Sequence, residues 1–451
     1  MRSPSLATFL SFLLPGLGQW YLGRQRSALL YAVPILVVTV LAVTQVLGGI
    51  PQIAIDLFSP TYSLTILILI VLFGLWRLTS MADAATSKAG WRSVGRRSSG
   101  VLALLAVVVI AVHAVGVYYA WSFYSAGSRI FVADPGTEPA PSGPGTPGGG
   151  GGDTLVATPF TTPATVASRI NILLTGIDSS AGRTHALNDT LILASVDPGT
   201  KKVAMISFPR DLANIPLWHG GVFTGKINAL MTYARQHPTE FPDGPLPSLI
   251  KELGYLAGAP IHYYAAVDLD GFRHLIDKVG GVDVNNPRQI DDPGYGGWTD
   301  HRPIGFSLSP GVHHLDGQTA LAYVRSRKGA GDSDFTRSRR QQQLLVALAR
   351  KLADPAMLPR LPDLLTVAGD TVRTNFPADR LREMMQITQG VNDDSISQVV
   401  LGPPYATTPA SPTRYILELD FRKVATLSMK IFGADSAYNG VAAGSPPPTG
   451  P

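Results

Sequence analysis

Residues 323–345 read YVRSRKGAGDSDFTRSRRQQQLL. From Phe335 to Ala353 the pattern predicts a helix, because apolar residues recur at helical spacing along one side. That apolar stripe consists of Leu344, Leu345, Leu348 and Leu352. Residues four positions apart lie one turn apart on a helix, so we expect Arg337 and Gln341 to share a face.

Two further arginines, Arg325 and Arg327, precede this helix across a turn rich in glycine and aspartate. A guanidinium group is a planar fork that binds phosphate oxygens in pairs, and a helix start adds free backbone N–H groups and the positive end of its dipole. The stretch therefore indicates an anion-binding face. A basic helix that is merely solvated is the simpler alternative, and acidic motifs elsewhere in the chain argue against it.

The composition limits the classes of function. The chain has 451 residues, which at roughly 150 residues per domain allows up to three units. It has no cysteine, so a disulfide framework and a thiolate site are excluded. The formal net charge is +5, but much of this excess lies in one loop of a membrane region. We therefore expect no nucleic-acid partner.

The first 125 residues predict a membrane region. Three apolar runs approach the roughly 20 residues that a helix needs to cross a bilayer. They are Ala28–Gly48, Pro60–Trp76 and Val101–Phe123. The earlier apolar segment Leu6–Leu14, followed by a Pro-Gly turn, is too short to assign as a span, a re-entrant piece or an interfacial helix.

Basic residues predict the orientation of these spans. The loop at 77–97 contains five of them, namely Arg77, Lys88, Arg92, Arg96 and Arg97. The loop at 49–59 has neither lysine nor arginine. By the positive-inside rule the basic loop is cytoplasmic. The third span then leads out of the cell, and we expect a multi-pass protein of the cell membrane whose remaining residues are extracytoplasmic.

Composition also marks a linker and a tail. Residues 126–165 include EPAPSGPGTPGGGGG and TPFTTPAT, which are typical of a spacer that is partly polyproline-like and partly flexible. Residues 436–451 end in GSPPPTGP, and we expect them to be disordered. A domain at 166–435 lies between these two segments.

This domain alternates predicted strands and helices, which favours the α/β class. We expect α-β-α layers around a central mixed sheet. The predicted strands are Ile170–Thr175, Thr190–Val196, Val203–Phe208, Tyr263–Val267 and Val399–Leu401. The predicted helices are Leu269–Val279, Gly317–Tyr323 and Phe335–Ala353.

Charged residues follow or begin several of these strands. Asp178 comes directly after NILLTGI, and Asp189 begins DTLILASV. Mg²⁺ is usually bound by one or two such carboxylates together with substrate phosphates. Arg210 and Asp211 follow the strand VAMIS and could form a phosphate clamp with a nearby base. Turn or cap residues and a surface ion pair are the alternatives.

The order of the motifs resembles the LytR-CpsA-Psr family of envelope glycan ligases. The motifs, within residues 168–353, are NILLTGID, DTLILASVDP, SFPRD, GKINAL, YYAAVDLDGF, GGVDV, HHLDGQTALAYVRSR and DFTRSRRQQQLL. The resemblance implies an extracytoplasmic Mg²⁺-dependent phosphotransferase. Such an enzyme moves a glycan phosphate from a polyprenyl-diphosphate-linked glycan to peptidoglycan, with the lipid tail inside the fold.

The resemblance also assigns residues. The family's metal ligands fall on Asp178 and Asp189. Its phosphate-binding positions fall on Arg210, Arg325, Arg327, Arg337 and Gln341, and further acidic positions fall on Asp211 and Asp334. Many members have an arginine where this chain has Leu187, and Arg183 could substitute for it.

Other sites were weighed against this assignment. Residues 220–227 nearly form a phosphate-binding loop, but Ile227 replaces the metal-binding hydroxyl residue. Asp268 and Asp270 form a D-x-D motif, which also suits a helix cap. Three histidines, His301, His313 and His314, lack regular metal-ligand spacing. A glycolipid receptor without turnover, a polyprenyl-diphosphate hydrolase and another glycosyltransferase remain as alternative functions.

Overall fold

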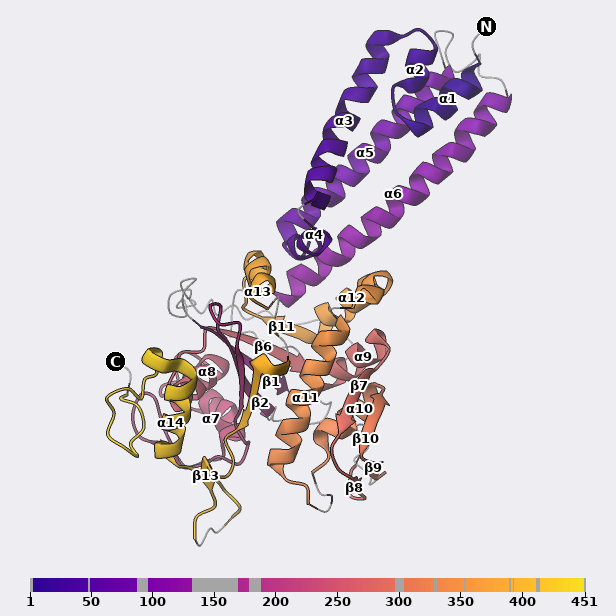
Figure 1. The fold of residues 1–451 in the computed structure, drawn as a ribbon. Helices are drawn as coiled ribbons and strands as arrows, with labels where there is room; N and C mark the ends of the chain where they lie inside the picture. The colour runs from indigo at the N-terminus through magenta and orange to yellow at the C-terminus, as the bar shows by residue number, and fades with distance from the viewer. Residues whose placement is uncertain are drawn as a thin grey trace. The chain divides into compact units, whose positions relative to one another are not determined.

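The computed structural model describes most of the chain outside the predicted linker. The described residues are 3–47, 49–86, 96–131, 169–177, 188–296, 304–327, 329, 331–352, 354–388, 391, 393–410 and 414–449. The chain divides into two compact units, Met1–Ser128 and Arg129–Pro451 (Figure 1). The first unit is helical and the second contains both helices and strands.

Three helices of the first unit are long and apolar enough to cross a membrane. They are α3 (Gln25–Leu47), α5 (Pro60–Thr86) and α6 (Arg96–Ile130), and a short α4 (Ile50–Asp56) follows α3. The sequence located all three, but the middle helix has 27 residues and continues ten residues beyond its apolar run, which the sequence ended at Trp76. The ten added residues include polar ones, but small side chains among them, such as Ala84, are buried inside the unit and keep this part of the helix packed.

The short N-terminal segment forms α1 (Pro4–Leu13) and α2 (Leu17–Tyr21). Ten residues of helix rise only about 15 Å, half of a hydrocarbon core, so α1 cannot cross a bilayer alone. The buried Gln19 holds this segment against α5, because its amide donates to the Ser80 carbonyl at 2.8 Å and accepts from the Ser11 hydroxyl at 3.0 Å.

The second unit is built on a six-stranded sheet in the order β11-β6-β1-β2-β3-β12. These strands are β1 (Ile170–Ile177), β2 (Asn188–Val196), β3 (Val203–Ser207), β6 (Tyr263–Asp268), β11 (Val372–Thr374) and β12 (Ile396–Val400). β1 pairs with β6 and β3 with β12 in parallel, whereas the β1–β2, β2–β3 and β6–β11 pairs are antiparallel. The predicted central mixed sheet is therefore confirmed.

Helices lie on both faces of this sheet (Figure 1). On one face are α7 (Leu230–Gln236), α8 (Pro245–Ala257) and α14 (Phe421–Phe432), and on the other are α9 (Leu269–Val279), α10 (Gly317–Arg325), α11 (Asp334–Leu352) and α12 (Leu361–Thr371). The first group shares one apolar core with sheet residues such as Leu173 and Leu193. This arrangement confirms the α-β-α layers.

Smaller elements complete the unit. They are α13 (Leu381–Thr388), β4 (Ile215–Pro216), β5 (Val222–Phe223), β7 (Val282–Asn286), β8 (Ile290–Asp292), β9 (Phe306–Leu308), β10 (Gly311–Leu315), β13 (Ala406–Thr407) and β14 (Glu418–Leu419). The antiparallel pairs β7–β10 and β8–β9 lie on the side of α9, α10 and α11. They bring β8 to the C-terminal end of α10, where Asp292 of β8 bonds Ser326.

Two helix ends differ from the expectation in a way that affects the site. α10 continues to Arg325, so this arginine lies in the last turn of a helix, where a cation is favoured by the helix dipole. α11 begins at Asp334, one residue earlier than predicted. A carboxylate in the first turn is favoured by the opposite end of the dipole.

The C-terminal segment makes two contacts with α8. Tyr438 is 2% exposed, and its hydroxyl donates to the Leu256 carbonyl at 2.9 Å. The ring lies over Gly258, where a β-carbon would come within 2.4 Å of it. Tyr255 donates to the Pro447 carbonyl at 2.8 Å. Disorder of the tail stays a prediction for the exposed residues around these contacts.

Candidate functional site

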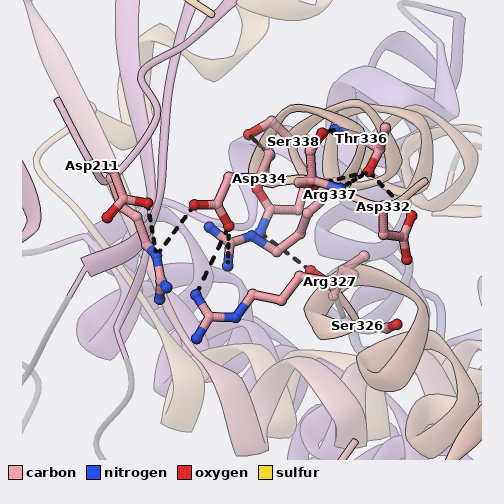
Figure 2. A network of polar contacts seen from close by, with 12 residues as sticks. Asp211, Ser326, Arg327, Asp332, Asp334, Thr336, Arg337 and Ser338 are labelled. Carbon is pink, nitrogen blue, oxygen red and sulfur yellow. Dashed lines mark hydrogen bonds and ion pairs between the residues drawn. The ribbon is translucent and has the colours of Figure 1, made fainter. Parts of the chain in front are cut away.

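Five of the predicted site residues meet at one place in the second unit (Figure 2). Arg210 and Asp211 follow the end of β3, Arg327 follows α10, and Asp334 and Arg337 lie in the first turn of α11. The amide of Gln342 ties α11 to the sheet, because it donates to the Ser207 hydroxyl in the last residue of β3 at 2.8 Å. The start of α11 is therefore held beside the segment that carries Arg210 and Asp211.

Asp334 is the centre of this cluster. Its carboxylate lies 3.2 Å from Arg337 Nη1, 3.7 Å from Arg210 Nε and 3.9 Å from Arg327 Nη1 (Figure 2). The Asp334 side chain is 11% exposed and that of Arg337 is 5% exposed. Three guanidinium groups from three separate segments thus converge on one nearly buried carboxylate.

Asp211 is the second carboxylate of the cluster and belongs to the same network. Arg210 Nε lies 3.7 Å from its carboxylate, and Lys226 Nζ forms a close ion pair with it. Lys226 also lies over the ring of Tyr415, 6.0 Å from its centre. Sequence reasoning did not single out Lys226, although it stands in the GKINAL motif. We therefore add Lys226 to the candidate site.

The pKa values of the two carboxyl groups are shifted in opposite directions. Burial raises the pKa of Asp334, and its hydrogen bond with Asp211 raises it further against the lowering effect of Arg337 and Arg210. Burial acts to raise the pKa of Asp211 too, but hydrogen bonds with Asp334 and Lys226 outweigh it, and that pKa is lowered. A proton on this pair therefore prefers Asp334, which can donate to an ionised Asp211.

Arg325 and Gln341, the other two predicted anion-binding residues, lie at the contact between α10 and α11. The Gln341 amide is buried and donates to the Val324 carbonyl at 3.4 Å. Arg325 is close enough to the half-buried Tyr295 to affect its pKa, which is raised by burial and lowered in part by Arg325. Gln341 therefore holds α11 against α10 at Val324, the residue directly before Arg325.

Of the two predicted metal ligands, the structure places only the backbone of Asp189, which is the second residue of β2. Asp178 lies outside the described residues, as do Leu187 and Arg183. Ile177 pairs with Asn188 in the antiparallel β1–β2 register, so the start of β2 lies beside the end of β1. Because β3 runs antiparallel to β2, its C-terminal end, which leads to Arg210, lies at that edge too.

This placement suits a magnesium ion. Within the described part of the chain, no three histidine or acidic side chains are grouped so as to hold a metal. Mg²⁺ does not need such a group, since it commonly takes one or two carboxylates, water and substrate phosphate. Asp178 and Asp189 are therefore, by their chemistry, a donor set of the kind that this ion takes.

The alternative motifs have local structural roles. Asp268 accepts a hydrogen bond from the Gly271 amide at 3.0 Å, as a helix cap does. Ile227 is buried in the apolar core, and residues 222–223 of the loop before it form β5. His314 bonds the Asp283 side chain on the facing strand at 2.8 Å. Of these motifs, residues 220–227 contribute Lys226 to the candidate site through its ion pair with Asp211.

The sequence model of the LytR_cpsA_psr family matches residues 156–415. This match covers more than half of the chain and includes the whole arginine cluster. The chain belongs to the LytR-CpsA-Psr family. The recognition made from the motifs is therefore confirmed.

The chain is also similar to individual proteins. The polyisoprenyl-teichoic acid–peptidoglycan teichoic acid transferase TagU of Oceanobacillus iheyensis is 31% identical over 234 residues, which are 52% of this chain and 67% of that protein. The corresponding transferase TagV of Bacillus subtilis is 31% identical over 244 residues, 52% of this chain and 58% of that protein. The crystal structure of B. subtilis TagV aligns with a TM-score of 0.46 at 27% identity, covering 59% of this chain and 96% of that one.

Proposed function

We propose that this protein is a membrane-anchored transferase that moves a glycan phosphate from a polyprenyl-diphosphate lipid carrier to a hydroxyl of peptidoglycan. The observation that carries the proposal is the convergence of Arg210, Arg327 and Arg337 on Asp334 in a nearly buried site. The printed names of TagU and TagV, which describe transfer of teichoic acid to peptidoglycan, support the same reaction class.

The cluster has an excess of positive charge that suits a diphosphate. Its cationic groups are Arg210, Lys226, Arg327 and Arg337, whereas its carboxylates are Asp211 and Asp334. Guanidinium groups in a water-poor site stabilise the charge that builds up on phosphoryl oxygens during transfer. The arginines would bind the diphosphate and orient it for attack.

The carboxyl pair supplies acid–base chemistry. The lowered pKa of Asp211 keeps its carboxylate ionised, and the raised pKa of Asp334 allows its carboxyl to exchange a proton nearer to neutral pH. A carboxylate of this pair can accept the hydrogen bond of an incoming hydroxyl and take up its proton as the new phosphoester bond forms. The lipid phosphate then leaves.

Mg²⁺ completes the proposed site. Asp178 and Asp189 would hold it, and when bound the ion would act as a Lewis acid on a phosphoryl oxygen. The start of β2, where Asp189 lies, and the end of β3, which leads to Arg210, reach the same edge of the sheet.

The membrane unit would place this chemistry outside the cell. We propose that α3, α5 and α6 are three spans. The basic segment 77–97, which includes the end of α5 and the start of α6, would be cytoplasmic because of its five basic residues, and the catalytic unit would be extracytoplasmic. The lipid carrier and peptidoglycan would then meet the site on the same side of the membrane.

The test is transfer by the purified full chain in detergent. A lipid-diphosphate-linked glycan with labelled phosphate is incubated with peptidoglycan fragments, and covalent label on the peptidoglycan is measured. We expect transfer in the wild type and loss of about a hundredfold in Arg337→Ala, since such charge-stabilising groups are typically worth a few kcal/mol. Arg339→Ala is a matched control, because Arg339 is exposed on the same helix.

Each other outcome identifies a different function. Release of glycan phosphate to water without attachment would replace the transferase by a hydrolase. Tight binding of the lipid without turnover would replace it by a receptor. Equal loss in Arg337→Ala and Arg339→Ala would remove the cluster from the proposed site.

A further inference from the structure

The two arginines that leave α10 are joined by a serine held almost completely inside the protein. Ser326 is 1% exposed. Its amide donates to the Ala322 carbonyl at 2.8 Å, which ends the helix. Its hydroxyl donates to Asp292 Oδ2 at 2.9 Å. Since Ser326 lies directly between Arg325 and Arg327, its position determines where both arginine side chains begin.

Asp292 of β8 accepts hydrogen bonds from both Ser326 and Arg327, the two residues directly after α10. The same Oδ2 atom that accepts from Ser326 accepts from the Arg327 amide at 3.0 Å. Asp292 is 2% exposed, so these charge-assisted bonds are sheltered from water. One carboxylate oxygen from a separate strand therefore fixes the backbone on which Arg327 stands.

Arg340 of α11 binds Ser326 from a second element of the fold. Its Nη2 donates to the Ser326 carbonyl and lies 3.4 Å from Asp332. Its guanidinium lies over the Tyr323 ring, 5.5 Å from the centre. Arg340 is 6% exposed. The side chain is thus immobilised by a carbonyl, a carboxylate and a ring.

We infer that Asp292 and Arg340 are positioning residues that hold Arg325 and Arg327 in place for the diphosphate of the substrate. Neither contacts the Asp334 carboxylate in any bond that we observe, so their effect passes through the backbone at Ser326. A flexible arginine loses conformational freedom when it binds an anion, and a fixed backbone reduces that loss. This inference rests on the proposed function and extends it to residues outside the phosphate-binding set.

The chemistry of the two residues favours positioning over simple packing. Buried charged groups are costly compared with apolar residues of the same size, so they are a poor way to gain stability alone. They do impose a specific geometry, because each hydrogen bond requires a direction and a partner. Here the partners are the amide of Arg327 and the carbonyl that precedes it.

We call the bonds that Asp292 and Arg340 make to Ser326 and Arg327 the clamp. The first experiment examines it without substrate. Hydrogen exchange at the Arg327 amide is measured in the full chain. We expect slow exchange in the wild type and in Asp292→Asn, whose amide oxygen still accepts, and fast exchange in Asp292→Ala. Ser326→Ala, which removes only a hydroxyl, should give an intermediate rate. Equal exchange in the wild type and the three variants would overturn the inference. If Asp292→Ala folds poorly, the comparison of Ser326→Ala with the wild type still tests it.

The second experiment asks whether the clamp acts through the arginine. We expect Asp292→Ala and Arg340→Leu to lower kcat/KM about tenfold or more, and Arg340→Lys to do so less. In an Arg327→Ala background the further loss should be clearly smaller than in the wild type, because only Arg325 is then left to be positioned and residues that act as one unit are not additive. Ser195→Ala is the control, since it removes a buried serine hydroxyl that bonds Asn171 on the neighbouring strand.

Inorganic pyrophosphate separates this inference from the proposed function. Its binding is measured by calorimetry, and we expect it to weaken in Asp292→Ala but not in Ser195→Ala. If the wild type binds pyrophosphate in this way but transfers no glycan, the proposed function fails and the clamp stands. If the wild type transfers glycan while the Asp292 and Arg327 effects simply multiply, the clamp fails and the function stands.

Discussion

At the scale of single residues, the geometry of a side chain matters as much as its charge. Arg337 is nearly buried and pairs with Asp334 at 3.2 Å. An ammonium group is a point charge that cannot reproduce the planar fork. The site should therefore respond to the shape of each cation as well as to its sign.

A lysine substitution tests this requirement. Arg337→Lys should lower kcat/KM for glycan transfer by about tenfold or more although the charge is kept. Gln341→Ala should do less damage, about fivefold, because its single 3.4 Å bond to Val324 is neutral and such bonds contribute about 1 kcal/mol. Full activity in Arg337→Lys, compared with Arg339→Lys as control, would reduce the cluster to a general positive field.

A second residue-scale prediction concerns pH. Burial raises the pKa of Glu252 on α8 from 4.5 to about 7, against the lowering effects of a hydrogen bond from the Trp218 amide and of Lys251. Because the folded pKa is raised, the stability that Glu252 contributes is present below pH 4.5 and is lost as pH rises through about 7. Glu252→Gln keeps an acceptor for the Trp218 amide without that charge.

The variant should therefore gain on the wild type as pH rises. From pH 5 to pH 8 we expect the difference in the free energy of unfolding to move by about 2–3 kcal/mol in favour of Glu252→Gln. Urea denaturation of the full chain in detergent at each pH measures it. A difference that does not change with pH would contradict the buried, titrating carboxyl.

At the scale of elements, strand ends bring together residues that the chain separates. The start of β2, which carries Asp189, lies beside the end of β1, and we propose that a divalent ion binds through the carboxylates of Asp189 and Asp178. We expect Asp178→Ala and Asp189→Ala each to lower Mg²⁺-dependent transfer about a hundredfold, and chelation of the metal to abolish it reversibly. Normal activity in both variants would move the metal elsewhere.

The C-terminal segment provides a second element-scale prediction. Tyr438 is buried against α8 and bonds the Leu256 carbonyl. Tyr438→Ala should lower the free energy of unfolding by about 3 kcal/mol, as loss of a buried aromatic ring usually does. Tyr438→Phe should cost only about 1 kcal/mol, because it removes one hydrogen bond and keeps the ring. Chemical denaturation measures the free energy of unfolding of each variant. If both values equalled that of the wild type, the tail would be disordered.

At the scale of the whole molecule, the proposed reaction depends on membrane topology. A reporter enzyme fused after Thr165 should be active only outside the cytoplasm, and one fused near Gly90 only inside, since the basic loop should remain in the cytoplasm. The α1–α2 segment is held on α5 through Gln19 and Ser80, so a reporter at the N-terminus should also be cytoplasmic. The reverse pattern would contradict the proposed function.

Local sequence patterns were sufficient for the membrane helices, for most strands of the sheet and for the family. Hydrophobic runs and periodicity depend only on neighbouring residues, which is why α9 was predicted at its observed bounds of Leu269–Val279. The arginine motif was recognisable for the same reason. Its helix was located to within one residue, at Asp334.

Only the tertiary structure decided which groups meet. Lys226 pairs with Asp211, Asp292 bonds Ser326, and Tyr438 covers Gly258, although each pair is far apart in the chain. Such contacts depend on sheet order and on which helix packs on which face, and no local pattern encodes these. The sequence alone therefore determined the kinds of chemistry that this protein carries, while long-range packing determined which carboxylate the arginines surround and which buried residues hold them there.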